Sequence, residues 1–361
     1  MRRVLLALLG AILLAACSTQ PVQGQGEFRA DMVTQLPAVR HVFVINLENK
    51  GYVETFGPSS QAPYLAKTLR AKGVLLKQYY AIGHHSLPNY IAQISGQGPD
   101  PQTQGDCSYF SPFRRTGTQY PGQAVGSGCV YPASVRTLGA QLRANGFRWR
   151  AYMEDMGRAC MHPRIGAKDT MRVAKVGDQY AVRHNPFVYF RSVIDHPAKC
   201  RSREVSLSHL STDLAKVSTT RNLSYITPNL CNDGHDQPCV DGRAGGLVSA
   251  NAWLKKWVPK ILASPAYRRN GLLVVTFDES EAGDTQACCG ETAVNTSKPG
   301  ITGPGGGRVG TVLISPYLKA GTVSTIPYNH YSLLRSIEDL FGLGHLGYAK
   351  TAPAFGSDVW G

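Results

Sequence analysis

Residues 271–277 read Gly-Leu-Leu-Val-Val-Thr-Phe, an apolar run that predicts a strand buried on both faces of a sheet. A second run of this kind, His41-Val-Phe-Val-Ile45, lies near the start of the chain. Strands buried on both faces are typical of parallel sheets, because the helical connections between parallel strands cover both faces. The two runs therefore predict an α/β protein.

Strand signals and helix signals alternate along the rest of the chain. Further strands are expected at residues 75–80, 148–153, 222–227 and 309–314. Helices are expected at residues 63–72, 88–95, 135–145, 250–262 and 331–341. Two segments rich in Gly and polar residues are expected to be long loops, 97–131 and 280–308. This alternation predicts a three-layer α/β/α sandwich with a mainly parallel central sheet.

The start of the chain has the pattern of a targeting segment. Arg2 and Arg3 precede an apolar run that ends in Leu-Ala-Ala-Cys17, which predicts a lipoprotein signal peptide at residues 1–16 and a lipidated Cys17. Polar residues 17–38 suit a flexible tether. We expect a lipid-anchored protein of the bacterial cell envelope, in the outer membrane or periplasm. No repeat or change in composition divides the remainder, residues 39–361, so we expect one domain there with long loop insertions.

The composition is that of a folded, basic protein. Hydrophobic residues make up 43% of the 361 residues and charged residues 17%, which excludes a disordered chain. The formal charge is +14, and removing the signal peptide takes away two arginines and no acid, which leaves +12. Such a surface attracts anions. Charge alone does not identify the anion; the residues and the resemblance described below lead us to expect a phosphorylated small molecule or lipid as partner, and no nucleic acid.

Eight cysteines remain when Cys17 is set aside, and an even number in an exported chain favours disulfides. Pairs close in sequence are expected, namely Cys107–Cys129 and Cys160–Cys200. A Cys231–Cys239 bridge would close a polar turn. The adjacent Cys288 and Cys289 are expected to have different partners.

Polar residues follow the predicted strands. They are Glu48 and Asn49; His84, His85 and Ser86; Asn229, Asn232, Asp233, His235 and Asp236; Asp278 and Glu279; and, beyond 309–314, His330. The carboxyl ends of parallel strands meet at one edge of a sheet, where α/β proteins place their sites. Carboxylates and imidazoles are ligands of divalent metal ions. The pattern predicts metal-assisted hydrolysis.

Ser86 is the candidate nucleophile at this edge. It stands between a predicted strand and Pro88, a position that predicts a helix N-terminus, where backbone N–H groups favour an anion. An N-cap is the alternative role for this serine. Asp278 and Glu279 could equally cap a turn, and His330 the last helix.

Several of these stretches resemble the bacterial phosphoesterase family that includes acid phosphatases and phospholipases C, within the alkaline phosphatase superfamily. The similar stretches are His41-Val-Phe-Val-Ile-Asn-Leu-Glu-Asn49 with Phe56-Gly57, Thr227-Pro-Asn-Leu-Cys-Asn-Asp-Gly-His-Asp236, Thr276-Phe-Asp-Glu279 and Tyr328-Asn-His-Tyr-Ser-Leu-Leu-Arg-Ser-Ile-Glu-Asp-Leu-Phe341. Ser86-Leu-Pro-Asn89 is similar to the nucleophile turn of nucleotide pyrophosphatases/phosphodiesterases. The resemblance spans roughly residues 40–350 and implies an alkaline-phosphatase-like fold.

The resemblance also implies roles for the residues at the strand ends. Ser86 would take the phosphoryl group as nucleophile. The residues on the metal side would be Glu48, Asn49, Ser86, Asp278 and Glu279. The residues that bind phosphate or a second metal would be Asp233, His184 and His85, with His235 and His330 as catalytic partners. Since two-zinc members of the superfamily have Asp where this chain has Asn49, one metal ion and two metal ions both remain open.

The resulting hypothesis is a phosphomonoesterase of the acid-phosphatase type with a phosphoseryl intermediate and a divalent metal ion. One alternative is a phosphodiesterase, which includes phospholipase C, or a phosphoinositide phosphatase. Phospholipases C of the family continue their Asp-Glu pair with a Gly-Gly and Asp-His-Val stretch, whereas this chain continues with Ser280-Glu-Ala-Gly283. An alternative of another class is a surface lipoprotein that binds an anionic polymer without catalysis.

Overall fold

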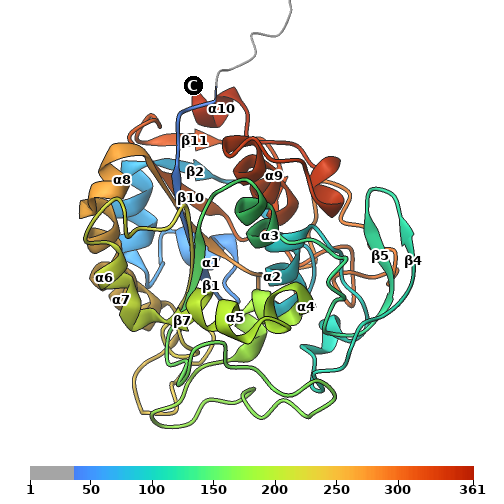
Figure 1. Cartoon of the computed structure of the whole chain (residues 1–361). Coiled ribbons are helices and arrows are strands. Elements are labelled where there is room, and N and C mark those ends of the chain that lie inside the picture. Colours follow the sequence, from blue (N-terminus) through green and yellow to red (C-terminus); the bar gives the residue numbers. More distant parts are fainter. Residues whose placement is uncertain (1–35) are drawn as a thin grey trace, which may run out of the picture. The chain divides into compact units, whose positions relative to one another are not determined.

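The computed structural model describes residues 36–361. Their largest sheet has eight strands in the order β11-β2-β10-β9-β1-β8-β6-β7 (Figure 1). These strands are β1 (His41–Leu47), β2 (Val74–Leu76), β6 (Trp149–Met153), β7 (Glu204–Ser206), β8 (Leu223–Thr227), β9 (Gly271–Phe277), β10 (Thr311–Ile314) and β11 (Thr322–Ser324). The signal peptide, Cys17 and most of the tether fall outside the described residues.

The centre of the sheet is β1, as its apolar sequence predicts. It pairs in parallel with β9 on one side, with Leu47 opposite Phe277, and with β8 on the other, with Ile45 opposite Ile226. Every residue of β1 and β9 is buried. Because β1 and β9 end at the same level, the residues that follow them lie side by side.

The strand β10 runs antiparallel to both of its neighbours, β9 and β2. Its carboxyl end therefore points away from the edge where β1 and β9 end. We expected β10 to end at the same edge as β1 and β9 and to lead directly to His330 there. This expectation for β10 is wrong. The chain returns through β11, which is parallel to β2, and through a short strand, β12 (Tyr328–Asn329), which pairs with β3 (Tyr79–Tyr80).

Helices cover both faces of the sheet and complete three layers, which confirms the predicted α/β/α sandwich (Figure 1). One layer contains α2 (Ser86–Ser95), α3 (Leu138–Ala144) and α9 (His330–Leu340), and α2 packs against both others. The other contains η1 (Tyr64–Leu69), α7 (Gly246–Ala263) and α8 (Pro265–Asn270), which pack together. None of the described helices combines the length and apolarity that a membrane crossing requires.

Shorter helices connect these layers. They are α1 (Tyr52–Phe56), η2 (Arg70–Lys72), η3 (Thr103–Gly105), η4 (Val182–His184), η5 (Pro186–Tyr189), α4 (Arg191–Ile194), α5 (Pro197–Arg203), η6 (Leu207–His209), α6 (Leu210–Asp213), η7 (Gly347–Lys350) and α10 (Ser357–Trp360).

Some local details differ from the expectations. The helix expected at 63–72 is a π-helical turn, η1, followed by a 3-10 turn, and the strand expected at 75–80 is split into β2 and β3. The loop expected at 97–131 contains the hairpin of β4 (Arg114–Gln119) and β5 (Gln123–Ser127). The short apolar runs there do not reveal such breaks, because their pattern is the same with or without them.

Four disulfides join the eight cysteines of the described region. Three are the expected bridges, Cys107–Cys129, Cys160–Cys200 and Cys231–Cys239. The expectation for Cys288 and Cys289 is wrong, since they are bonded to each other. Among the described residues the other six cysteines are already paired with one another, so each of these two has only the other as a partner there.

Candidate active site

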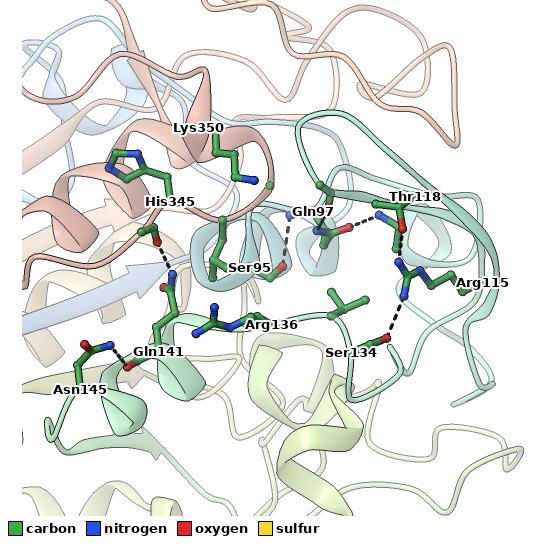
Figure 2. Close-up of a pocket in the computed structure, with 16 residues that line it drawn as sticks. Ser95, Gln97, Arg115, Thr118, Ser134, Arg136, Gln141, Asn145, His345 and Lys350 are labelled. Carbon is green, nitrogen blue, oxygen red and sulfur yellow. Dashed lines mark hydrogen bonds between the residues drawn. The ribbon is translucent and has the colours of Figure 1, made fainter.

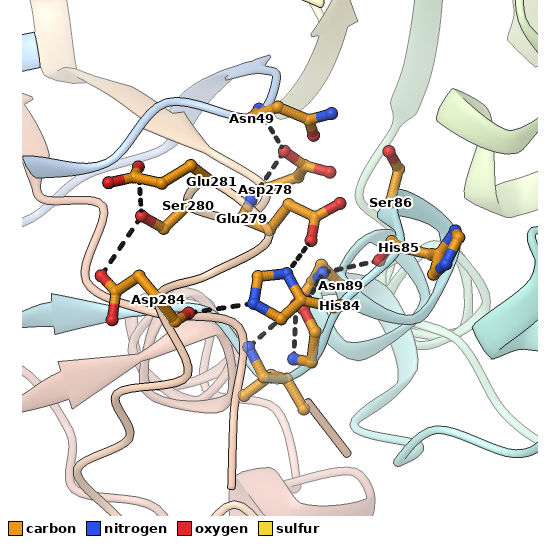
Figure 3. Close-up of polar contacts among 12 residues, drawn as sticks. Asn49, His84, His85, Ser86, Asn89, Asp278, Glu279, Ser280, Glu281 and Asp284 are labelled. Carbon is orange, nitrogen blue, oxygen red and sulfur yellow. Dashed lines mark hydrogen bonds and ion pairs between the residues drawn. The ribbon is translucent and has the colours of Figure 1, made fainter. Parts of the chain in front are cut away.

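Ser86 is the first residue of α2, and a tight turn of residues 82–85 delivers it there (Figure 3). The Asn89 side chain holds this turn: its Oδ1 accepts from the N–H of Ile82 at 2.8 Å, and its Nδ2 donates to the carbonyl of His85 at 3.0 Å. His85 has a φ of 62°, which turns the chain sharply into the helix. Ser86 is buried, and its Oγ donates to Glu48 Oε2 at 2.7 Å.

Three carboxylates lie beside Ser86 because β1 and β9 are adjacent and in register. Glu48 follows β1, and Asp278 and Glu279 follow β9. Asp278 Oδ1 accepts from the N–H of Asn49 at 3.0 Å and from the N–H of Glu279 at 2.6 Å. Its other oxygen, Oδ2, is buried without a hydrogen-bond partner. The structure thus brings the predicted carboxylates together.

Burial strongly disfavours the charged form of these acids. It raises the pKa of Glu48 and of Glu279 well above the ordinary value, and the neighbouring Asp278 carboxylate adds to both shifts. Burial also raises the pKa of Asp278 to about 6. Buried carboxylates that carry their charge need a positive partner.

The residues present fit a divalent cation as that partner. With its amide turned so that nitrogen faces the two acids, Asn49 donates to Glu48 Oε2 and to Glu279 Oε1, each at 3.3 Å, and Asp278 Oδ2 is buried without a partner. Carboxylate oxygens are the donors that hard cations prefer. The five residues predicted for the metal side are therefore neighbours at one sheet edge.

A second group adjoins Glu48 from behind Ser86. His184 Nε2 lies 3.4 Å from Glu48 Oε2, and His184 Nδ1 lies 3.3 Å from Asp233 Oδ2. Burial lowers the pKa of His184, which keeps the imidazole neutral, and raises the pKa of Asp233. These three residues can offer one ligand atom each, all within 4.8 Å of one another, and could hold a metal ion.

The turn that presents Asp233 depends on the residue after it. Gly234 has a φ of 110°, and a Cβ there would lie 2.9 Å from the carbonyl oxygen of Glu48. A glycine is required at such a close approach. The Asn-Asp-Gly-His stretch thus packs its backbone directly against the end of β1.

A cationic group borders Ser86 on the solvent side. His85 Nδ1 lies 3.5 Å from Asp106 Oδ2, and this carboxylate raises the pKa of His85. The buried Arg183 lies 3.7 Å from the same Asp106 oxygen through its Nε and 3.2 Å from His235 Nε2 through its Nη2. Asp106 Oδ1 also accepts from the N–H of Leu87 at 3.0 Å.

Asp106 and Arg183 change the prediction that the start of α2 binds the anion. Because Asp106 already binds the N–H of Leu87, anion binding near Ser86 depends on the cationic side chains more than on the helix N-terminus. The sequence does not mark Asp106 and Arg183 as site residues, because neither directly follows a predicted strand. Their signals were indirect: Asp106 precedes the bridged Cys107, and Arg183 precedes His184.

His330 lies on the inner side of the carboxylates. Its Nε2 donates to the carbonyl oxygen of Asp278 at 2.6 Å, and its Nδ1 lies 3.1 Å from the Tyr79 hydroxyl. Burial lowers the pKa of His330 to about 4, so the ring is neutral. His84, adjacent to the site, pairs through Nδ1 with Glu279 (Figure 3).

A pocket of about 420 Å³ opens above Ser86. Its lining residues are Asn49, His84, His85, Ser86, Asp106, His235, Glu279, Ala282, Gly300, Ile301 and Thr302. His330 is not among the described residues that line this pocket. Of the predicted histidines, His85 and His235 therefore face the open space, whereas His184 and His330 support it from inside.

A separate hollow of about 450 Å³ lies at the other end of α2 (Figure 2). Its wall includes Ser95, Arg115 and Arg136 together with Lys350 from η7. None of the predicted site residues lines it, among the residues that the structure describes. The predicted site residues that line a hollow therefore line the pocket at the N-terminal end of α2.

Comparisons with known proteins show what the chain as a whole is similar to. The model of the Phosphoesterase family matches residues 58–344. The phosphatidylinositol-3-phosphatase of Mycobacterium tuberculosis is 26% identical over 329 residues, covering 90% of this chain and 84% of that protein. The phosphate-repressible acid phosphatase of Penicillium chrysogenum is 28% identical over 362 residues, covering 96% of this chain and 72% of that protein.

Solved structures agree at the level of the fold. The PsFucS1 sulfatase from Pseudoalteromonas sp. is similar with a TM-score of 0.50 and 13% identity, over 84% of this chain and 68% of that chain. At this identity the likeness concerns the fold alone. The two proteins thus share the arrangement of the sheet and its helices over most of this chain.

Proposed function

This chain belongs to the Phosphoesterase family and is a hydrolase acting on phosphate esters, and from that premise we propose that it is a phosphomonoesterase of the acid-phosphatase type with a phosphoseryl intermediate and metal assistance. The observation that carries the proposal is the 2.7 Å hydrogen bond from Ser86 Oγ to Glu48 at the floor of the pocket. A serine at a helix start, bonded to a carboxylate and open to a pocket, is arranged as a nucleophile.

In the first step Ser86 Oγ attacks phosphorus as the bond from phosphorus to the alcohol oxygen breaks. Glu48 Oε2, which accepts the 2.7 Å hydrogen bond from Ser86 Oγ, is placed to take the serine proton. Tyr90 also donates its hydroxyl to Glu48, which fixes the carboxylate in place. In the second step water attacks the phosphoserine, phosphate leaves, and Ser86 recovers its proton.

His85 is placed to protonate the departing alcohol. It lines the pocket next to Ser86, and the neighbouring Asp106 raises its pKa, which favours the protonated form in acid solution. Arg183, whose Nη2 lies 3.2 Å from His235 Nε2, supplies positive charge beside the pocket, and His235 lines the pocket and can hydrogen-bond a phosphoryl oxygen. With these side chains, proton donation and binding of the phosphoryl oxygens do not require the N–H groups at the start of α2.

A divalent cation fits between Glu48, Asn49, Asp278 and Glu279, where it would offset the buried negative charge and lower the pKa of the Ser86 hydroxyl. The chain's own residues prepare for it. His330 holds the Asp278 backbone through its 2.6 Å hydrogen bond, so we assign His330 a positioning role. His184 and Asp233 are the candidates for a second ion.

The proposal extends to the place of the enzyme in the cell. We propose that the signal peptide at residues 1–16 is removed, that Cys17 carries lipid, and that residues 17–38 tether the enzyme to the bacterial envelope. The mature charge of +12 would then draw anionic esters to a surface-bound enzyme.

Hydrolysis of an aryl phosphate by Ser86→Ala tests the proposal. We expect a loss of at least about a thousandfold in kcat. Ser95→Ala, at the other end of α2, is the matched control, because its hydroxyl bonds only backbone groups at that end: it donates to the carbonyl of Ile91 at 2.7 Å and accepts from the N–H of Gln97 at 3.3 Å. Activity in Ser86→Ala equal to that of the Ser95 variant would rule out the mechanism.

A lipid-headgroup monoester is the second candidate substrate, and the similarity to a phosphatidylinositol-3-phosphatase favours it. Phosphodiesters are the competing class. Rates on matched monoesters and diesters of one alcohol separate the two, and we expect the monoester to be hydrolysed faster. An active diesterase would overturn this choice, and a protein that binds anionic polymer but hydrolyses neither would point to a non-catalytic role.

A further inference from the structure

The pocket above Ser86 has two kinds of wall. The polar wall comes from the strand ends and the start of α2, and includes His85 and Glu279. The other wall is apolar or small and comes entirely from the loop of residues 280–308. Its members are Ala282, Gly300, Ile301 and Thr302. Residues 280–308 thus form the side of the pocket that offers no charged side chain to a phosphate group.

Ile301 is an unusual residue for its position in this loop. It has a φ of 62°, a conformation that a β-branched side chain rarely adopts. It is also 39% exposed, although its side chain is apolar. Asn or Gly would fit this backbone without strain, and a polar side chain would suit the exposure. Backbone strain of this kind persists where the surrounding structure holds it, and it is found at functional sites.

The loop is fixed with respect to the nucleophile. The carbonyl of Pro299 accepts from the N–H of His84 at 3.3 Å and from Gln104 Nε2 at 2.9 Å. The N–H of Ile301 donates to the carbonyl of Lys298 at 2.9 Å. His84 lies two residues before Ser86, so these bonds hold the Ile301 side chain at a constant place above the serine.

We propose that Ile301 is a specificity-determining residue that contacts the leaving group, and that the enzyme prefers phosphate monoesters of apolar alcohols over those of polar alcohols. This inference rests on the proposed phosphomonoesterase function. With the phosphoryl group at Ser86, the carbon chain of the ester extends toward the mouth of the pocket. There it meets Ile301 and Ala282, and the contact removes apolar surface of both partners from water.

The test compares hexyl phosphate with glycerol 3-phosphate, two monoesters that differ in the polarity of the alcohol. The readout is the ratio of their kcat/KM values. In Ile301→Asn we expect this ratio to fall about tenfold, mainly through a higher KM for hexyl phosphate. In Ile301→Val, which keeps an apolar β-branched side chain on the same strained backbone, we expect a fall of less than about threefold.

The two variants separate apolarity from strain, because Asn relaxes the backbone and Val does not. An unchanged ratio in Ile301→Asn, or an equal fall in both variants, would overturn the inference. A series of alkyl phosphates on the unaltered protein gives an independent reading: kcat/KM should rise about threefold per methylene over the first few carbons. A flat series overturns the inference as well. If the unaltered protein hydrolyses no monoester, the proposed function fails instead.

Discussion

Replacing Asp278 by Asn in the metal-free protein should make the fold more stable at neutral and alkaline pH. Asp278 is buried, its pKa is raised from 3.8 to about 6, and its Oδ2 has no hydrogen-bond partner. Asn keeps the oxygen that accepts from the N–H groups of Asn49 and Glu279. It removes the charge that burial disfavours.

The sign and the size of the effect follow from the pKa. The folded state holds the Asp278 proton more tightly than the unfolded state does, so ionisation favours unfolding as pH rises. The penalty is absent below pH 3.8, grows between pH 3.8 and 6, and is complete above pH 6. The difference in pKa corresponds to about 3 kcal/mol. The gain from Asp278→Asn should therefore be near zero at pH 3.5 and reach at most about 3 kcal/mol at pH 8.

Urea unfolding in EDTA at pH 3.5, 6 and 8 measures this gain. Added Mg²⁺, Mn²⁺, Zn²⁺ or Ca²⁺ should then reverse the order, because a cation at a thousand times its Kd stabilises the unaltered protein by about 4 kcal/mol, which exceeds the gain from the substitution. Asp213→Asn is the matched control with the opposite sign, since Asp213 pairs with Arg150 and accepts from Tyr152 at 2.7 Å. A metal-free Asp278→Asn less stable than the unaltered protein at pH 8 would refute the reasoning.

Two further predictions concern stability away from the site. Burial raises the pKa of Glu204 from 4.5 to about 8, and neither of its oxygens has a hydrogen-bond partner. Glu204→Gln should therefore stabilise the fold by up to about 5 kcal/mol at pH 9 and by almost nothing at pH 4. Equal effects at both pH values in chemical unfolding would contradict this. A disulfide stabilises a fold by lowering the entropy of the unfolded chain, and the effect grows with the length of the closed loop. Removing the Cys160–Cys200 bridge, which spans 40 residues, should therefore lower the free energy of unfolding by about 4 kcal/mol, and removing Cys288–Cys289 by about 1 kcal/mol. Equal decreases in the midpoint of urea unfolding would contradict this.

The centre of the sheet and the gathering of carboxylates at its edge could be predicted because their signals are local. The apolar runs of β1 and β9 indicate buried strands, and the acids come directly after them in sequence. Parallel strands end at one edge, so Glu48 and Asp278 had to lie close together once both strands were placed. This reasoning needs no knowledge of loop conformation.

The remaining features depend on contacts between distant segments. The apolar residues of β10 do not reveal its direction, because an antiparallel strand and a parallel one bury the same side chains. Asp106 lines the pocket and Arg183 pairs with it from the short helix η4, and no periodic pattern in the sequence marks either residue. The role of Ile301 depends on its backbone conformation, which its neighbours in sequence do not predict.

The central claim is that Ser86 carries the phosphoryl group during turnover. Acid quenching during steady-state hydrolysis of an aryl phosphate, followed by mass spectrometry of peptides, tests it most directly. The account predicts a peptide that contains Ser86 with the added mass of one phosphoryl group, located on that residue by fragmentation and absent from Ser86→Ala. Rapid hydrolysis in which no quenched sample carries phosphate on Ser86, together with inversion of configuration at phosphorus, would contradict it.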